Sequence, residues 1–502
     1  MVGMALLNAN RRVCFGPQAR RGCGGPALPM RAYERRQWEI SRVRETSPGS
    51  KEAGMATSTD SSVYVLNSKN RSNYGGTAEI AIRRIRPSTL PPGKPPTAQI
   101  VMVAGRTIPA RVSFDLLSNA NDGHYSWARE IADRCQAEVW IMEVQCMGAS
   151  NRVYAMSDFT NILKGEQIKA FGRVLYGPNW PYHLNDSDSE WQELDAVVDH
   201  VRSEAIKENP NWYSEGAGRV ILIGYSAGAY VVGPYAMQNP GKVWALLLLA
   251  PIFPPNGPAD LPRPFAAPDP SRTDRFYGAP MGVHTKKTIW PEPPVPQPQG
   301  CLPERNDYVI DDLWAAMMAN ERTPNLVPGQ GEIALYPTRF WWGWNQKLVE
   351  TNPQLGKEPL GGAPTSDIGI PVLIIAGTED VLIRAKADST DGRGPFSVDH
   401  LYRAIAGRGK AMMYDIECAG HNIVWQDPSR HKLHDLSIEW IRGFANYVGP
   451  VNSPAYTPVR LPHGGSGRYL VPRNGGPPQP WEGPATTSSS LRLYRDLRLS
   501  SP

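Results

Sequence analysis

One stretch near the middle of this 502-residue chain constrains its fold more than any other. Residues 220–223 are apolar, and they lead directly into Gly224-Tyr-Ser226-Ala-Gly228 and a series of small and apolar residues. This order predicts a buried strand, a sharp turn and a helix. Glycines two positions to either side of a serine let strand and helix approach closely, so that the hydroxyl projects clear of the sheet. We interpret Ser226 as a nucleophile; a chance match to a short pattern is the alternative.

Apolar runs and amphipathic stretches alternate on both sides of this turn. Such alternation is typical of a mostly parallel sheet that helices cover on both faces. Residues 62–66 and 77–85 instead alternate with period two, which predicts an N-terminal β-hairpin. The expected core strands are residues 99–105, 138–144, 220–224, 243–251, 370–377 and 410–416, and the expected helices are residues 127–135, 190–207, 307–320, 398–406 and 431–448.

Composition divides the chain into a core, an insertion and two tails. The first tail is basic, and the second is rich in Pro, Gly and Ser, so both are expected to be disordered. Prolines concentrate between residues 251 and 303, where no regular core element is expected. The expected organisation is a disordered basic extension at 1–58, a core at 59–252 and 366–449, an inserted lid at 253–365 and a disordered tail at 450–502.

The distribution of charge argues against a nucleic-acid-binding platform. The net charge is +5, but residues 1–54 carry ten Arg or Lys against four Glu, and residues 450–502 carry six Arg against two acids. The body of the chain is therefore mildly acidic, and the basic ends are sparse. No apolar run reaches the roughly 18 residues of a membrane-spanning helix, so no integral membrane segment is expected.

The six cysteines are scattered, without a C-x-x-C pair or metal-ligand spacing. Free thiols in a reducing compartment are therefore the favoured interpretation over disulfides. We expect a cytoplasmic protein, or an organellar one if residues 1–54 are a transit peptide.

A serine hydroxyl needs a base, which a carboxylate orients. In parallel sheets such groups lie in loops at the carboxyl ends of strands. His421 is the histidine that directly follows a late strand, and it comes after Ala-Gly420. Asp380 follows the preceding strand and is the expected acid, with its neighbour Glu379 as the rival and helix capping as the structural alternative. The expected triad is Ser226, Asp380 and His421, in the order nucleophile, acid, base.

Two backbone N–H groups should stabilise the oxyanion of a tetrahedral intermediate. One is expected from Ala227, at the start of the helix after the nucleophile. The other should come from the loop after the strand at 99–105, from Arg106 or, failing that, from Thr107.

With these pieces placed, the chain resembles the α/β-hydrolase family, in its serine-nucleophile, esterase- and lipase-like branch, over roughly residues 60–448. The resemblance is carried by the serine turn, by Asp380 and His421, and by the motifs Val101-Met-Val-Ala-Gly105 and Gln145-Cys-Met-Gly148-Ala-Ser150. It implies no cofactor and no metal. A subset with Phe114-Asp115 and then Gly123-His-Tyr-Ser-Trp127 is the most similar, and is mostly described only as hydrolase.

The chain departs from the family pattern at two motifs. Ala104-Gly105 stands where the family often has His-Gly, so a different arrangement of the oxyanion loop is expected. Gln145-Cys-Met-Gly148-Ala-Ser150 stands where Asp-x-x-Gly-x-Gly-x-Ser is common, and we interpret that segment as a structural turn. Serine at the turn argues against the related epoxide hydrolases and haloalkane dehalogenases, which use aspartate there.

Aromatic residues in the expected lid suggest an apolar or aromatic small-molecule substrate. Trp341, Trp342 and Trp344 follow Phe340, and Tyr225 stands beside the nucleophile. Packing of the insertion on the sheet is the alternative role for these tryptophans. The sequence predicts hydrolysis of a carboxylic ester, lactone or thioester through an acyl-enzyme. Acyl transfer by the same triad, or a non-catalytic binding role for the fold, are the alternatives, and the oligomeric state stays open.

Overall fold

The computed structural model describes residues 56–66, 77–91, 93–117, 124–177, 185–210, 218–252, 281–290, 301, 307–320, 325–327, 331–340, 370–383, 398, 401–402, 405 and 411–445, together with four short strands beyond residue 450. All of these residues belong to one compact unit that begins at Gly54.

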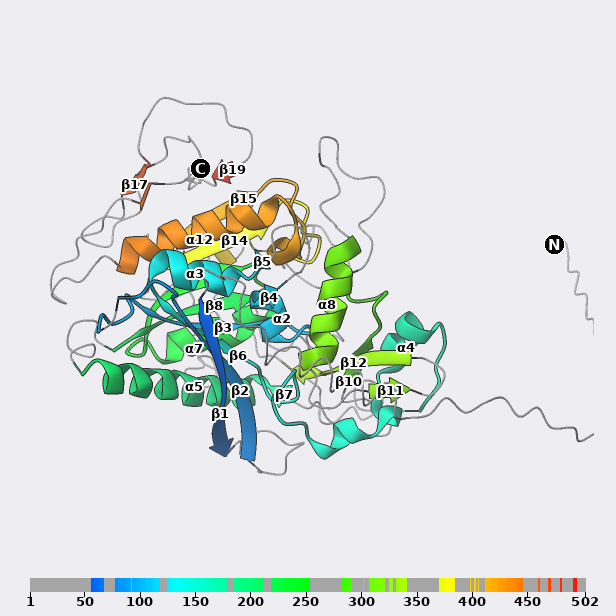
Figure 1. The fold of residues 1–502 in the computed structure, drawn as a ribbon. Coiled ribbons are helices and arrows are strands. Elements are labelled where there is room, and N and C mark those ends of the chain that lie inside the picture. The colour runs from blue at the N-terminus through cyan, green and yellow to red at the C-terminus, as the bar shows by residue number, and fades with distance from the viewer. Residues whose placement is uncertain are drawn as a thin grey trace, which may run out of the picture. The chain divides into compact units, whose positions relative to one another are not determined.

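A nine-stranded sheet forms the centre of this unit (Figure 1). Strands β6, β3, β8, β9, β14 and β15 run parallel, and their side chains are almost all buried. The expected hairpin adds β1 and β2 antiparallel at one edge. In spatial order the strands are β1 (Thr57–Leu66), β2 (Thr77–Arg86), β6 (Glu138–Met142), β3 (Gln99–Val103), β8 (Val220–Tyr225), β9 (Val243–Leu249), β14 (Val372–Gly377), β15 (Ala411–Ile416) and β19 (Leu491–Leu493).

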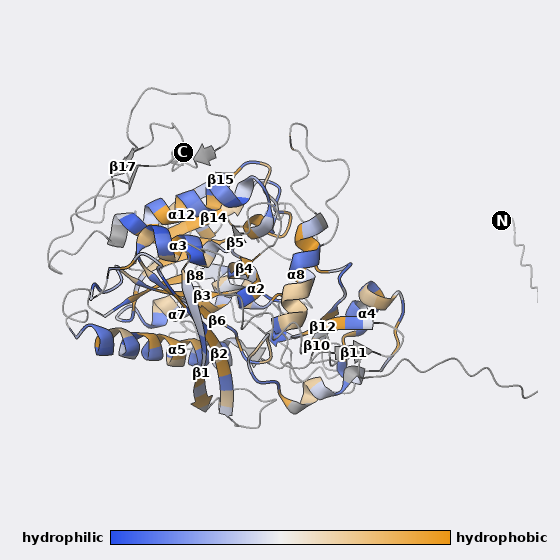
Figure 2. Cartoon of the chain, viewed as in Figure 1, coloured by the Kyte–Doolittle hydropathy of each residue, from blue (hydrophilic) through white to orange (hydrophobic). Residues whose placement is uncertain are grey.

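Helices cover both faces of this sheet, as the alternation predicts. Helices α3 (Trp127–Cys135) and α12 (Ser429–Ala445) pack together on one face, and α5 (Ser187–Glu208) and α7 (Ala229–Gln238) on the other (Figure 1). Hydrophilic residues recur along α3, α5 and α12, whereas the parallel strands between the helices are mainly hydrophobic (Figure 2). Burial of apolar surface between these layers supplies the main stabilisation of the core.

Helix α3 has the bounds that its periodicity predicts. The Ser126 hydroxyl caps its start by accepting a hydrogen bond from the Arg129 N–H at 3.1 Å. Its end is set by Gln136, whose φ of +53° is left-handed. The residues that start and end this helix are its direct sequence neighbours, so its bounds do not depend on distant parts of the chain.

The part of the insertion that the structure describes contains more regular structure than its prolines suggested. Helix α8 (Asp307–Asn320) has its expected bounds. Three antiparallel strands, β10 (Met281–His284), β12 (Gly331–Pro337) and β11 (Asn325–Val327), form a small sheet. Strand β10 corrects the expectation of no regular core element between 251 and 303. Its four residues contain no proline, and the side chains of Met281 and Val283 are buried in a second apolar cluster.

That second cluster packs the insertion against the segment after β6. It joins residues of β10 and β12 to Val153, Met156 and Ile162. The sequence of this segment predicted no regular element, but the structure has the short helix α4 (Lys164–Phe171) there. Strand β13 (Arg339–Phe340) closes the described part of the insertion and pairs in parallel with β7 (Asn185–Asp186).

Four short strands lie in the last 53 residues, where a disordered tail was expected: β16 (Val459–Arg460), β17 (Arg468–Leu470), β18 (Gln479–Pro480) and β19. Strand β19 extends the central sheet by pairing antiparallel with β15. Strand β1 begins at Thr57, inside the extension that was expected to be disordered at 1–58. Residues 1–55 and the other residues of the tail lie outside the described residues.

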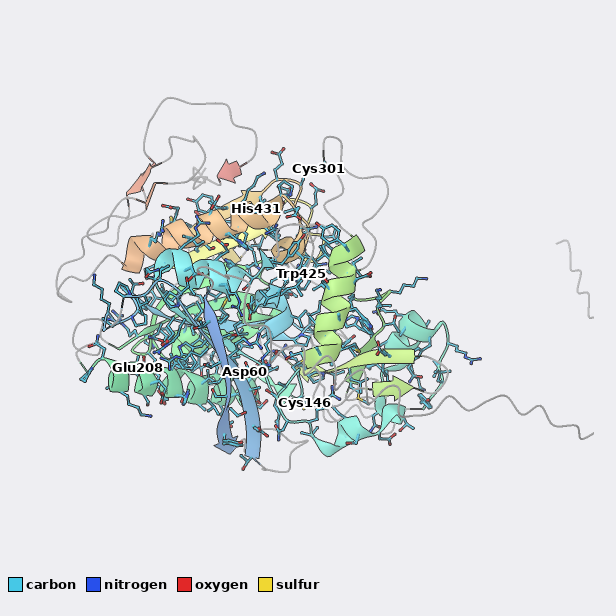
Figure 3. All side chains as sticks on the ribbon, in the orientation of Figure 1. Asp60, Cys146, Glu208, Cys301, Trp425 and His431 are labelled. Carbon is cyan, nitrogen blue, oxygen red and sulfur yellow. A yellow bond between two sulfur atoms is a disulfide. The ribbon has the colours of Figure 1, made fainter. Side chains whose placement is uncertain are left out.

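The cysteines correct the expectation of free thiols. Cys301 and Cys418 form a disulfide that joins the insertion to the loop after β15, with Cα atoms 5.3 Å apart (Figure 3). Cys135 and Cys146 are free and buried, and burial raises the pKa of both thiols to about 12. The sequence did not predict this disulfide, because the two cysteines are 117 residues apart and share no motif.

Removing this disulfide should destabilise the fold. A link that closes a loop of 117 residues restricts the unfolded chain, so Cys301→Ser/Cys418→Ser should lower the free energy of unfolding by roughly 4–5 kcal/mol. Urea denaturation with and without a reducing agent measures the effect. Cys135→Ser, which removes a free thiol, serves as the control for the substitution itself. An unchanged midpoint on reduction of the wild-type protein would contradict the disulfide.

Candidate active site

The turn after β8 holds Ser226 in a strained conformation. Its φ is +55°, a left-handed value that non-glycine residues rarely adopt and that clusters at functional sites. A Cβ on Gly224 would lie 2.4 Å from Cγ2 of Val232, and one on Gly228 would lie 2.4 Å from the carbonyl oxygen of Val103. Both glycines of the motif are therefore required by close packing, as the sequence predicts.

Ser226, His421 and Asp380 meet at the carboxyl edge of the sheet. The distance from His421 Nε2 to Ser226 Oγ is 2.8 Å, and from His421 Nδ1 to Asp380 Oδ2 it is 2.7 Å. Asp380 is fully buried, and the His421 side chain is 17% exposed. With the proton on Nδ1, the imidazole donates to the carboxylate and accepts from the serine hydroxyl, which suits general-base catalysis.

Asp380, and not its rival Glu379, contacts the histidine. The second oxygen of Asp380 accepts a hydrogen bond from the Leu382 N–H at 3.0 Å, which fixes the carboxylate. Glu379 instead accepts from the Thr378 hydroxyl at 3.1 Å.

The two loops that carry Asp380 and His421 are bonded to each other. The N–H of Glu379 donates to the Ala419 carbonyl at 2.9 Å, and the N–H of Cys418 donates to the Thr378 hydroxyl at 2.9 Å. A Cβ on Gly377 would lie 2.1 Å from that same Ala419 oxygen. Asp380 and His421 therefore approach each other through backbone contacts that local sequence does not reveal.

The Tyr225 side chain packs against His421 and is hydrogen-bonded to its backbone. Its ring stacks on the imidazole with centroids 5.6 Å apart, and its hydroxyl donates to the His421 carbonyl at 3.0 Å. Burial, with a contribution from the Asp380 carboxylate, raises the pKa of the Tyr225 phenol, so the hydroxyl stays a donor. Tyr225 was expected to touch substrate, and the structure places its hydroxyl against the loop of the base.

The segments that carry the expected oxyanion donors both lie beside Ser226. Ala227 follows it directly and is buried. A Cβ on Gly105 would lie 2.9 Å from Ser226 Cβ and 3.3 Å from Ser226 Oγ, so the backbone that continues into Arg106 and Thr107 passes beside the serine. The Arg106 guanidinium reaches towards the insertion, 6.0 Å from the ring centroid of Tyr336.

The segment from Gln145 to Ser150 forms a turn, as interpreted from the sequence. The Ser150 hydroxyl donates to the Glu143 carbonyl at 2.7 Å and accepts from the N–H of Ala81 at 2.9 Å. Gly148 has a φ of +48°, and a Cβ there would lie within 3 Å of Glu143. The segment thus fastens the end of β6 to β2.

A buried ion pair beside the serine was not anticipated. Arg339 contacts Glu190 at 2.5 and 2.8 Å, and its Nη1 donates to the Gly105 carbonyl at 2.7 Å. Both side chains are fully buried. The two residues are 149 positions apart, one in an aromatic-rich segment and one at the start of a helix, so no sequence pattern links them. The neighbouring Trp341, Trp342 and Trp344, expected to bind substrate, lie outside the described residues.

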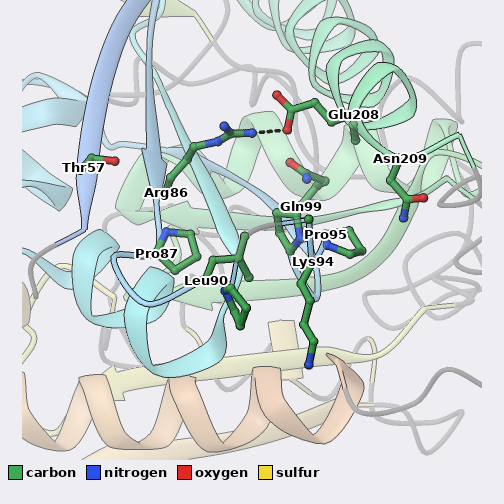
Figure 4. Close-up of a pocket in the computed structure, with 13 residues that line it drawn as sticks. Thr57, Arg86, Pro87, Leu90, Lys94, Pro95, Gln99, Glu208 and Asn209 are labelled. Carbon is green, nitrogen blue, oxygen red and sulfur yellow. Dashed lines mark hydrogen bonds and ion pairs between the residues drawn. The ribbon is translucent and has the colours of Figure 1, made fainter.

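A separate pocket of about 430 Å³ lies at the opposite edge of the sheet (Figure 4). Gln99, at the start of β3, lines it together with Arg86 and Glu208, which are paired with each other. The amino ends of parallel strands are not where such sheets bind substrates, so this pocket is not a candidate active site. Among the described residues, no group of three or more His, Cys, Asp or Glu side chains could hold a metal ion.

A model of the "Alpha/beta hydrolase family" matches residues 100–431, about two thirds of the chain. The chain belongs to this family. The match spans β3, the serine turn, Asp380 and His421, and the sheet has the strand arrangement that the resemblance implied. Membership supports a hydrolase that acts on a small-molecule substrate. Within the described residues, no helix is long and apolar enough to cross a membrane.

Solved structures of other hydrolases are similar to the chain at low identity. A thioesterase domain from the curacin biosynthetic pathway is 13% identical, covering 75% of this chain and 99% of its own, with a TM-score of 0.37. A thermophilic esterase from Thermogutta terrifontis is 13% identical, with coverages of 76% and 98% and a TM-score of 0.38. A monoacylglycerol lipase from Paleococcus ferrophilus is 12% identical, with coverages of 70% and 96% and a TM-score of 0.38. No curated protein matches the chain.

The Tyr225 hydroxyl should contribute measurably to the stability of the fold. Tyr225→Phe leaves the His421 carbonyl without this partner, which should lower the free energy of unfolding by about 1–2 kcal/mol. Urea denaturation checks the value. Tyr64→Phe, at a residue that is 67% exposed, should change nothing; equal effects of the two substitutions would contradict this role of Tyr225.

Proposed function

We propose that this member of the alpha/beta hydrolase family is a serine esterase that cleaves carboxylic esters, lactones or thioesters through an acyl-enzyme. The observation that carries the proposal is the continuous set of short contacts from Ser226 through His421 to the buried Asp380. A serine hydroxyl is a poor nucleophile until a base accepts its proton, and this arrangement supplies the base and its orienting acid.

In the proposed reaction, Ser226 attacks the substrate carbonyl while His421 accepts the hydroxyl proton. Asp380 holds the imidazole in the required tautomer and stabilises its charged form. The backbone N–H groups of Ala227 and Arg106 stabilise the negative oxygen of the tetrahedral intermediate, with Thr107 as the other donor considered. His421 then returns the proton to the leaving group, and water hydrolyses the acyl-enzyme.

The proposed substrate has an apolar or aromatic acyl or alcohol group. Support comes from the sequence of the insertion, where Trp341, Trp342 and Trp344 follow β13 directly. Large aromatic side chains near a site favour bulky apolar ligands.

Labelling with a fluorophosphonate tests the proposal, because such a probe modifies only an activated serine. The wild-type protein should be labelled and should hydrolyse p-nitrophenyl esters, whereas Ser226→Ala should do neither. Asp380→Asn should lower kcat by about 10⁴-fold, because an amide in place of the carboxylate no longer holds the imidazole in the tautomer with its proton on Nδ1. The matched control is Glu379→Gln, which changes the adjacent acid that does not contact the histidine.

Each outcome decides between the functions considered. Absence of labelling in folded protein would overturn the proposal in favour of a non-catalytic binding protein. Product partitioning towards an added alcohol or amine acceptor, in preference to water, would identify an acyltransferase.

The compartment is a separate proposal. The scattered cysteines favoured the cytoplasm, or an organelle if residues 1–54 are a transit peptide, whereas a disulfide such as Cys301–Cys418 is typical of an oxidising compartment. Alkylation of protein denatured directly from cells distinguishes them: both thiols react if the compartment is reducing, and neither reacts before chemical reduction if it is oxidising.

A further inference from the structure

A charged side chain of the insertion contacts the loop that faces the nucleophile. Arg339 donates from Nη1 to the Gly105 carbonyl at 2.7 Å, while Nε and Nη2 contact the two oxygens of Glu190 at 2.5 and 2.8 Å. Neither side chain of the pair is exposed. A bidentate pair fixes the plane of a guanidinium, so the direction of Nη1 is defined.

The Gly105 carbonyl and the Arg106 N–H belong to one peptide group. The bond between these residues is not among the cis peptides of the described chain, so the two groups point in opposite directions. Because the carbonyl points at Arg339, the N–H points away from it. Gly105 itself lies against the serine, with its Cβ position 2.9 Å from Ser226 Cβ.

We propose that Arg339 is a positioning residue for the oxyanion hole: it holds the Gly105–Arg106 peptide so that the N–H of Arg106 is presented to the substrate oxygen. This inference rests on the proposed esterase function, and it concerns a residue that does not touch substrate. A charge-assisted hydrogen bond to the carbonyl also polarises the peptide group, which makes its N–H a stronger donor.

The burial of the pair supports a positioning role. Two buried charges seldom add net stability, because desolvation offsets their attraction, and such pairs can be replaced by apolar residues without loss of the fold. Here Nη1 of the guanidinium is directed at the Gly105 carbonyl, in the loop beside Ser226. Arg339 and Glu190 are brought together because β13, which carries Arg339, pairs with β7, and β7 directly precedes α5, which carries Glu190.

This arrangement gives the Ala104-Gly105 departure a physical meaning. The oxyanion loop carries alanine before its glycine, and the carbonyl of that glycine accepts from an arginine supplied by the insertion. The orientation of the loop is thus set by a residue more than 230 positions away in the sequence.

The test uses the double variant Glu190→Leu/Arg339→Met, which removes the bond to Gly105 without leaving a buried charge. For p-nitrophenyl ester hydrolysis, kcat should fall about 10- to 100-fold, less than the roughly 10²–10³-fold loss of a whole oxyanion donor. KM should stay within about twofold. Affinity for an aryl trifluoromethyl ketone, whose serine adduct places an oxyanion in the hole, should fall by the same factor as kcat. The pH profile of kcat should be unchanged, because the triad contacts remain.

Two further variants keep the inference open to refutation. Arg339→Lys retains the charge without the rigid fork, and its kcat and inhibitor affinity should fall between those of the wild type and the double variant. Arg84→Met removes a largely buried arginine from Glu138 on the hairpin side of the sheet, where Arg86 remains as a partner, and should leave both quantities unchanged.

Rates are taken per active site titrated to completion with fluorophosphonate, so that a loss of folded protein is not counted as a loss of turnover. Wild-type kcat and inhibitor affinity in the folded double variant would overturn the inference, as would an equal loss in Arg84→Met. If the double variant does not fold, unchanged values in Arg339→Lys overturn it. Absence of labelling in the wild-type protein would instead overturn the proposed function.

Discussion

The close approach of the turn after β8 to the end of β3 is the constraint on which the candidate site depends. A Cβ on Gly228 would lie 2.4 Å from the Val103 carbonyl oxygen, so glycine is needed there for the strand and the helix start to touch. The same packing holds Ser226 at a φ of +55° and brings it beside Gly105. Strain at the serine is maintained because the surrounding backbone leaves no room for relaxation.

The parallel sheet brings together the three residues of the candidate site. The carboxyl ends of β8, β14 and β15 lie at one edge, so Ser226, Asp380 and His421 meet although the chain separates them widely. A backbone hydrogen bond between the loops of Asp380 and His421 then holds the two side chains within contact distance. Membership in the alpha/beta hydrolase family accords with this geometry and leaves the substrate to experiment.

The insertion is bonded to the core at two loops of the candidate site. Arg339 contacts Gly105 in the oxyanion loop, and Cys301 is joined to Cys418, three residues before the candidate base. Both contacts join the described part of the insertion to loops of the candidate site.

The sequence by itself determined the features that local patterns encode. Alternating apolar runs predicted the parallel sheet, the motif around Ser226 predicted the turn, and an amphipathic pattern predicted α3 to the residue. Chain order and strand ends were enough to choose His421, and to favour Asp380 over Glu379. Only the tertiary structure revealed strand β10, the Cys301–Cys418 disulfide and the contact of Arg339 with Gly105. These depend on which distant segments lie together, and a short strand between prolines or a pair of residues more than 100 positions apart leaves no periodic signal in one sequence.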